Sequence, residues 1–335
     1  MRKLILAGSA IAVMATCAVA QIGERLSTPC RQEVVRLCGM NREAIRGCLT
    51  QKVEQLSGSC RAEIRERVAA RGGLSRNAVT QAGEELNYGS DAKQKLDYFA
   101  VAGKSDVPLV VFIHGGGWSI GDKKHGAGPK SGYYNGLGYA FASLNYRLVP
   151  KVTPGDQATD IANAISYLRK NATKLGFDAK RIFIMGHSAG AHLAALVGSD
   201  TRYLDQAGVP VSVIKGAILL DGAGYDVAAQ MRYKGNKVQG MYDAAFGSSP
   251  AVHAELSPIT HAGAPNIGNW LILHVESRPD ATAQSQALGK ILSANGAAVQ
   301  VKAVPDSTHM SVNQDAGKAG SFVGDEIARF LARLD

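Results

Sequence analysis

Ser188 lies in a pattern that can expose a reactive hydroxyl. The chain reads Gly186-His187-Ser188-Ala189-Gly190 directly after a short apolar run and directly before a helical stretch. In a G-x-S-x-G between a strand and a helix, the glycines allow a sharp turn that presents the serine side chain. The start of the following helix offers positive potential to a developing oxyanion. The pattern therefore predicts that Ser188 is a nucleophile.

A run of three glycines follows another apolar segment, in His114-Gly115-Gly116-Gly117-Trp118. Backbone N–H groups can converge on a small anion only where no side chain blocks the approach. We therefore expect the amides of Gly116, Gly117 and Ala189 to form an oxyanion hole, and His114 to brace the loop. Phosphate binding is excluded, because the chain has neither a G-x-x-x-x-G-K-[ST] loop nor a G-x-G-x-x-G that opens a helix.

A base and an acid must complete such a site. His309 lies in a loop after the last apolar strand, where it can reach Ser188 and accept its proton. The acid must hold the imidazole tautomer, and three carboxylates follow late strands. We choose Asp280, because it lies in the loop just before the next helix. Glu276 is the second choice and Asp221, after the preceding strand, the third.

HGGGW, Asn145-Tyr146-Arg147-Leu148-Val149-Pro150 and GHSAGAHL together resemble the hormone-sensitive-lipase-like esterases of the α/β-hydrolase superfamily, with their feruloyl-esterase and formamidase relatives. The resemblance covers about residues 83–335. It implies a serine esterase that forms a covalent acyl-enzyme on a small-molecule ester, without cofactor or metal, and with partners in the order Ser, Asp, His. The family's H-G-x-x-D pattern is altered here, since the chain reads His274-Val275-Glu276-Ser277-Arg278-Pro279-Asp280. An amide or formamide substrate is the alternative.

The elements that position these residues alternate between short apolar runs and amphipathic stretches. This alternation predicts an α/β fold with a mostly parallel sheet flanked by helices. We expect strands at 94–98, 109–113, 139–146, 181–185, 215–220, 270–275 and 299–304, and helices at 155–175, 188–197, 282–295 and 321–334. The least periodic stretch, 222–269, is expected to build a wall of the binding site. Aromatic residues near glycine turns that could line an acyl pocket are Trp118, Tyr133, Tyr134 and Tyr225.

The first twenty residues have the pattern of an export signal. Met1-Arg2-Lys3 is basic, 4–13 is apolar, and Ala18-Val19-Ala20 is an A-x-A cleavage site. We expect a periplasmic or secreted protein with a mature start near Gln21. A lipid anchor at Cys17 is the weaker alternative, because Met14 and Thr16 suit a lipobox poorly.

The remaining cysteines, Cys30, Cys38, Cys48 and Cys60, lie close together in the sequence. Their separations of 7, 9 and 11 residues are not those of a structural zinc site, so disulfides are expected. Three amphipathic helices are predicted within 28–72, the first capped by Thr28. If the first two fold back antiparallel, Cys38 meets Cys48 and Cys30 is left for Cys60. Closing that outer loop stabilises the module by roughly 3 to 4 kcal/mol.

We accordingly divide the chain into a signal peptide at 1–20, a cysteine-rich helical module at 21–76 and a catalytic domain at 77–335. The module resembles the cysteine-rich repeat named for a Golgi glycoprotein. It carries eleven basic and six acidic residues. Such a surface could bind an anionic envelope or polysaccharide. Nucleic acid is not expected, because no aromatic residue lies among the charges to stack on bases.

Composition excludes two further classes of protein. Of the residues, 46% are hydrophobic and 19% charged, which excludes a disordered chain. No apolar run after the signal is long enough for a membrane-spanning helix. The rival to an enzyme is a binding protein that anchors a hydrolase-like scaffold to an envelope or polymer.

Overall fold

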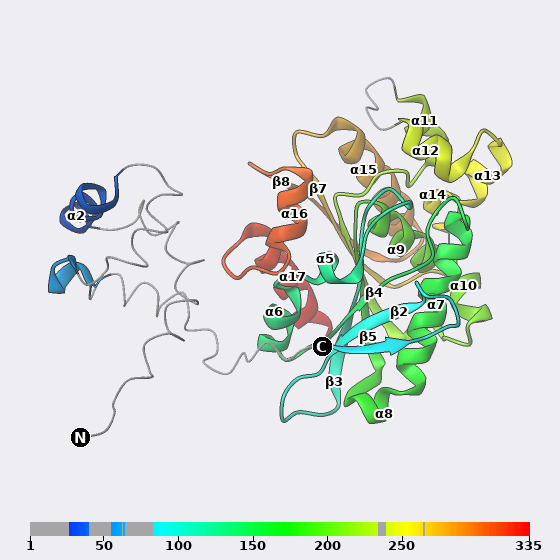
Figure 1. Ribbon diagram of the computed structural model, residues 1–335. Helices are drawn as coiled ribbons and strands as arrows, with labels where there is room; N and C mark the ends of the chain where they lie inside the picture. Colours follow the sequence, from blue (N-terminus) through cyan, green and yellow to red (C-terminus); the bar gives the residue numbers. More distant parts are fainter. Residues whose placement is uncertain (1–26, 40–54, 62, 64–82, 234–238, 264) are drawn as a thin grey trace. The chain divides into compact units, whose positions relative to one another are not determined.

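The computed structural model describes residues 27–39, 55–61, 63, 83–233, 239–263 and 265–335 (Figure 1). The chain divides into two compact units, Met1–Ala78 and Val79–Asp335. The expected signal peptide, Cys48, the second predicted helix up to residue 54 and the end of the third lie outside the described residues.

The second unit is built on one eight-stranded sheet with the strand order β1-β2-β4-β3-β5-β6-β7-β8. The two pairings that involve β2 are antiparallel, and all the others are parallel. The predicted α/β fold with a mostly parallel sheet is therefore confirmed. The strands are β1 (Glu84–Asn87), β2 (Lys95–Phe99), β3 (Val107–Ile113), β4 (Ala140–Leu144), β5 (Phe177–His187), β6 (Ile214–Leu220), β7 (Asn269–Val275) and β8 (Ala298–Val304).

The central strands are apolar on both faces because helices cover both faces of the sheet. Every residue of β3 is buried, and alternate side chains enter two separate cores. Leu109 and Val111 join the first core, whereas Val110 and Phe112 join the second. A continuous apolar run, without polar alternation, is what a parallel strand covered on both faces requires.

The helices divide between these two cores. The first core contains side chains of α7 (Pro154–Lys170), α9 (Ala189–Ser199) and α15 (Pro279–Ala294). The second contains side chains of α5 (Lys123–Ala127), α6 (Lys130–Gly136), α16 (His309–Asp315) and α17 (Phe322–Leu334). The predicted helix at 155–175 is interrupted at Asn171, where α7 ends and α8 (Ala172–Leu175) begins.

The stretch between β6 and β7 is helical rather than irregular. Its described elements are α11 (Val227–Arg232), α12 (Gln239–Phe246), α13 (Pro250–Glu255) and α14 (Pro258–His261). Two aromatic side chains of α12, Tyr242 and Phe246, pack edge-on against Trp118. This stretch between β6 and β7, called the insertion below, therefore contacts the loop that carries the glycine run. The remaining elements are α10 (Arg202–Gln206) and the short η3 (Val211–Val213).

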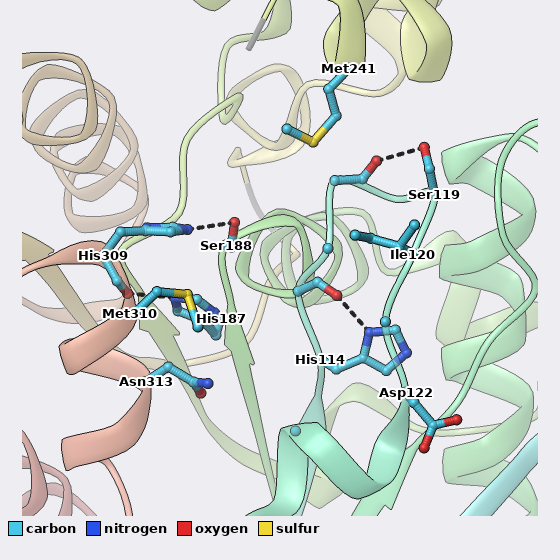
Figure 2. A pocket seen from close by; sticks show the side chains of 15 residues that line it. His114, Ser119, Ile120, Asp122, His187, Ser188, Met241, His309, Met310 and Asn313 are labelled. Carbon is cyan, nitrogen blue, oxygen red and sulfur yellow. Dashed lines mark hydrogen bonds between the residues drawn. The ribbon is translucent and has the colours of Figure 1, made fainter. Parts of the chain in front are cut away.

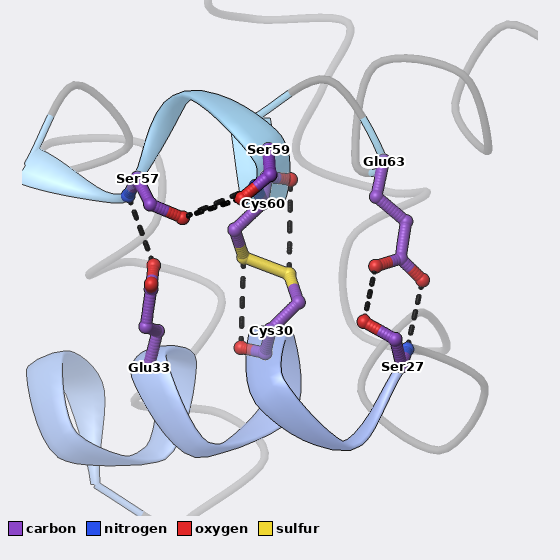
Figure 3. Close-up of a disulfide and its surroundings, with 7 residues drawn as sticks. All are labelled: Ser27, Cys30, Glu33, Ser57, Ser59, Cys60 and Glu63. Atoms are coloured by element: carbon purple, nitrogen blue, oxygen red, sulfur yellow. Dashed lines mark hydrogen bonds between the residues drawn. A yellow bond between two sulfur atoms is a disulfide. The ribbon is translucent and has the colours of Figure 1, made fainter.

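In the first unit, a disulfide joins α2 (Thr28–Cys38) to a short helical turn that begins at Gly58 (Figure 3). The predicted Cys30–Cys60 disulfide is confirmed, with the two Cα atoms 4.9 Å apart. Ser27, not Thr28, is the N-cap of α2, and it donates from its backbone and hydroxyl to Glu63. Cys38 is also disulfide-bonded, but its predicted partner Cys48 lies outside the described residues.

No helix in the described part of the chain is long and apolar enough to span a membrane.

Candidate active site

Ser188 occupies a sharp turn between β5 and α9. Its φ of 57° and ψ of −122° are unusual for a residue with a side chain, and such strain persists only where the surroundings impose it. A Cβ on Gly186 would collide with the carbonyl of Gly190, and a Cβ on Gly190 would collide with that of Ile113. At both positions another stretch of backbone lies too close for a side chain, so both must be glycine. The sharp turn that they allow presents the Ser188 side chain.

His309 is the first residue of α16, and its imidazole faces Ser188 (Figure 2). Its Nε2 lies 2.9 Å from the Ser188 hydroxyl oxygen. Thr308 caps the helix by accepting from the Ser311 amide, while the Ser311 hydroxyl accepts from the Thr308 amide. This capping box fixes the start of the helix and with it the position of the ring. The side chain of His309 is 36% exposed, so it is open to a small molecule.

The expectation that Asp280 lies against this imidazole is wrong. Asp221 takes that place, with its Oδ2 2.6 Å from Nδ1 of His309. The Asp280 carboxylate instead accepts from Arg278 at 3.1 Å and from Gln230 at 3.2 Å.

The order of the strands explains why Asp221, and not Asp280, contacts His309. Asp221 follows β6, which pairs directly with β5 before Ser188, and the Ser188 amide donates to the last carbonyl of β6. Asp280 lies in the first turn of α15 after β7, one strand farther from β5. The residue four positions after His274, where H-G-x-x-D has its acid, is Arg278. Glu276, the second choice, is exposed.

The Asp221 carboxylate is fully buried, and both of its oxygens accept hydrogen bonds. Its Oδ1 accepts from the Val275 amide at 2.8 Å, and its Oδ2 accepts from Arg278 Nη1 as well as from His309. Burial alone would raise the pKa of Asp221. The hydrogen bond from His309, the charge of Arg278 and the Val275 amide outweigh that effect and hold the pKa below its usual value. Asp221 is therefore an anion at neutral pH.

The glycine run lies against the Ser188 turn. A Cβ on Gly115 would come within 2.8 Å of the His187 carbonyl oxygen, so only glycine allows this contact. Gly116 and Gly117 have φ angles of 117° and 56°, which favour glycine. Among the described residues, the amides of Gly116, Gly117 and Ala189 have no hydrogen-bond acceptor. Three unengaged donors beside a serine hydroxyl suit an oxyanion.

Two buried histidines contact the residues around the proposed site, His187 at His309 and His192 at Trp118. The sequence patterns did not reveal these contacts. His187 donates from Nε2 to the carbonyl oxygen of His309 at 2.8 Å, and their ring centroids lie 4.5 Å apart. His192 accepts from Trp118 Nε1 at 3.2 Å and donates to the Leu256 carbonyl at 2.8 Å. Burial lowers the pKa of His187 to about 3 and that of His192 to about 4, so both rings are neutral.

His114 contacts the glycine run, because its Nδ1 lies 2.7 Å from the carbonyl oxygen of Gly115. Its ring stacks on Tyr146 at a centroid distance of 4.4 Å, and Tyr146 donates to the His114 carbonyl at 2.7 Å.

Two cavities meet at Ser188 and His309. The larger, of about 510 Å³, extends past His114, Ile120 and Met310 (Figure 2). The smaller, of about 220 Å³, is lined by Trp118, Ala223, Tyr242 and Arg278 among others. Met241 lines both.

Of the four aromatic residues considered from sequence, Trp118 alone lines these cavities. Tyr133 and Tyr134 donate to backbone carbonyls of α17 and of the residue after α16, and Tyr134 belongs to the second core. Tyr225 is fully buried. Tyr242, in the insertion, is the aromatic residue that sequence analysis missed.

Comparison with known proteins agrees with this architecture. The BD-FAE family model matches residues 96–292, which is more than half of the chain. Isoprenylcysteine alpha-carbonyl methylesterase ICME of Arabidopsis thaliana is 33% identical over 176 residues, which are 50% of this chain and 39% of that protein. Kynurenine formamidase of Danio rerio is 29% identical over 268 residues, or 74% of this chain and 82% of that protein.

Among solved structures, esterase B from Lactobacillus Rhamnosis superposes with a TM-score of 0.65 at 24% identity, over 82% of this chain and 92% of that one. This likeness shows the fold. The chain spans about two fifths of the length of the Arabidopsis methylesterases that it matches. From the family match and the architecture together, the chain belongs to the BD-FAE family and has the α/β-hydrolase fold.

Proposed function

We propose that this protein is a carboxylic ester hydrolase that uses Ser188 as a nucleophile and passes through a covalent acyl-enzyme. The observation that carries the proposal is the continuous contact from Ser188 Oγ to His309 Nε2, and from His309 Nδ1 to Asp221. That chain of contacts has the geometry of a serine-hydrolase triad. The methylesterase relative supports the same class of reaction.

In the proposed first step, His309 Nε2 takes the hydroxyl proton while Ser188 Oγ bonds to the acyl carbon of the ester. Asp221 accepts from Nδ1–H, which keeps Nε2 free to act as the base and stabilises the imidazolium that forms. The imidazolium then gives its proton to the departing alkoxide oxygen. A water molecule, activated by the same ring, releases the acid and restores Ser188.

The negative oxygen of each tetrahedral intermediate would lie at the amides of Gly116, Gly117 and Ala189. These donors are held by the glycine loop and by the start of α9, so they need no reorganisation when charge develops. The helix start adds positive potential.

We assign the acyl group to the smaller cavity and the alcohol to the larger. Both cavities reach the proposed oxyanion amides, Gly116 and Gly117 in the larger and Gly117 and Ala189 in the smaller. The smaller cavity, of about 220 Å³ and walled by Trp118 and Tyr242, has room for a short acyl chain. The larger contains Met310 and Ile120, which are 56% and 70% exposed at its rim, so a bulky alcohol can leave there. This predicts small acyl groups on small to medium alcohols, aromatic or sugar-linked alcohols included.

A panel of nitrophenyl, feruloyl and acetyl-sugar esters tests the proposal. We expect turnover of at least one short-acyl ester, and Ser188→Ala should lower it by roughly a thousandfold or more while the protein stays folded. Equal turnover by Ser188→Ala would rule out the proposed nucleophile.

A formamide or other amide is the second candidate substrate. The formamidase relative is similar over 82% of its own length, more than the methylesterase, and this observation favours including the amide class. The same residues would act, with the imidazolium protonating a leaving amine. The ratio of kcat/KM for an N-formyl arylamine to that for the matching ester decides whether the amide or the ester is the preferred substrate class.

We also propose that the protein is exported and that its first unit binds an anionic envelope or polysaccharide. The Cys30–Cys60 disulfide supports an oxidising compartment, and the excess of basic residues in 21–76 supports an anionic partner. Mass spectrometry of the expressed protein tests cleavage after Ala20. Retention on an anionic matrix, compared between the whole chain and a chain without 21–76, tests the partner.

A further inference from the structure

Arg278 reaches the centre of the proposed triad from the loop between β7 and α15. Its Nη1 donates to Oδ2 of Asp221 at 2.5 Å and lies 3.0 Å from Nδ1 of His309. Its Nη2 donates to Asp280 at 3.1 Å. One guanidinium therefore connects the buried carboxylate to a second carboxylate on α15.

The charges around Arg278 are arranged to keep it cationic and fixed. Burial alone would lower the pKa of Arg278, but the charges of Asp221 and Asp280 raise it. Gln230 also donates to Asp280, so the second carboxylate is itself held. Because the guanidinium is planar and donates in two directions, these contacts leave it little freedom to rotate.

The position of Nη1 matters for the tautomer of His309. Nδ1 has two neighbours, the acceptor Asp221 at 2.6 Å and the donor Arg278 at 3.0 Å. If Nδ1 carries a proton it donates to Asp221, and Nε2 is free to take the proton of Ser188. If Nδ1 accepted from Arg278, Nε2 would carry the proton and could not act as a base.

We propose that Arg278 is a positioning residue of the triad, which orients the Asp221 carboxylate toward Nδ1 of His309 and balances its buried charge. The inference rests on the proposed ester hydrolysis. Arg278 acts through Asp221. With Asp221 present, the guanidinium donates to the carboxylate and orients it. Without that carboxylate, Nη1 of Arg278 can donate only to Nδ1 of His309, which favours the tautomer that carries its proton on Nε2 and cannot act as a base.

A double-mutant cycle of Arg278→Ala and Asp221→Asn tests this dependence, with kcat and KM measured on one short nitrophenyl ester. Arg278→Ala should lower kcat on the order of 10- to 100-fold through misplacement of the carboxylate, with KM changed less than about threefold. Adding Arg278→Ala to Asp221→Asn should not lower kcat further, because Arg278 then has no carboxylate to orient and its donor to Nδ1 favours only the unproductive tautomer.

Arg147 provides a matched control. It pairs with the buried Asp160, and the side-chain exposures of 29% and 0% equal those of Arg278 and Asp221. Arg147→Ala removes a comparable ion pair from a loop that does not line either cavity. It should lower stability in a similar way and leave kcat within about twofold, because it orients no group of the triad.

The inference is overturned if folded Arg278→Ala keeps kcat within twofold, or if its loss multiplies with that of Asp221→Asn. If Arg278→Ala does not fold, Arg278→Lys replaces it. An ammonium cannot hold Asp221 and Asp280 in the same fork, so kcat should fall at least about fivefold at a similar KM. An unchanged kcat overturns the inference. If the unchanged protein hydrolyses no ester of the panel, the proposed function fails instead.

Discussion

Asp221 and His309 are joined by a 2.6 Å hydrogen bond although 88 positions separate them in the chain. Asp221 follows β6 and His309 opens α16, so their meeting depends on the placement of β6 beside β5. The proposed triad therefore takes its acid from the strand adjacent to that of the nucleophile.

Asp221→Asn and Asp280→Asn should differ sharply in turnover. We expect Asp221→Asn to lower kcat by about 10³- to 10⁴-fold, because the amide cannot hold the productive tautomer. Asp280→Asn should stay within about tenfold, since Asp280 contacts the site only through Arg278. Steady-state kinetics on a nitrophenyl ester measures both, and the reverse order would restore Asp280 as the acid.

Gly116→Ala should damage the proposed oxyanion hole. Gly116 has a φ of 117°, and a Cβ there would collide with the Ile120 carbonyl, so the loop must shift. Loss of one aligned donor lowers kcat on the order of 100-fold. Gly138→Ala is the control, because Gly138 has a φ of 92° but open space around it. It should cost stability alone, about 1 to 2 kcal/mol. Equal kcat for the two variants would contradict the assignment.

His192 should make the protein sensitive to acid. Burial lowers the pKa of His192 from 6.5 to about 4, so the unfolded chain binds the proton more tightly than the folded chain. The free energy of unfolding should therefore fall as the pH drops from 6.5 toward 4, by roughly 2 to 3 kcal/mol for this residue.

His192→Gln isolates that contribution, because His187 and Asp221 remain. Urea unfolding of both proteins at several pH values between 7.5 and 4.5 should show the variant less stable at neutral pH, through the lost contact to Trp118. The gap should narrow on acidification. Parallel pH dependences would mean that His192 is not held neutral.

Ala223→Leu should narrow the acyl preference. Ala223 lines the smaller cavity, and added methyl groups there leave less space for a longer acyl chain. We expect the kcat/KM ratio of acetate to butyrate nitrophenyl esters to rise about tenfold. Ile120→Ser, at the rim of the larger cavity, should leave that ratio unchanged. A change confined to Ile120→Ser would place the acyl group in the larger cavity.

Much of the fold was predictable because burial leaves a local pattern. All seven expected strands occur. The central parallel strands are covered on both faces and must be apolar throughout, which leaves a clear apolar run in the sequence. β1 was missed because its residues, Glu84–Asn87, include one buried side chain among three exposed ones. The short helices α5, α6 and α16 were missed as well, since helices of this length depend on tertiary packing more than on periodicity.

The site was predictable only in part, for a related reason. Ser188 and the glycine run carry their geometry in their own flanking residues, and His309 follows a recognisable strand. The partner of His309 depends on which strands are neighbours, and no local pattern records that order. Asp280 was chosen from its loop, whereas strand order places Asp221 there and Arg278 between the two carboxylates.

Labelling with a fluorophosphonate tests the central claim most directly, since the reagent bonds to an activated serine and needs no knowledge of the substrate. Mass spectrometry of the digested protein should find the phosphonyl group on the peptide that contains Ser188. Asp221→Asn should slow the labelling, and Ser188→Ala should abolish it. Absence of labelling, or a label on another serine, would contradict the claim that Ser188 is the nucleophile.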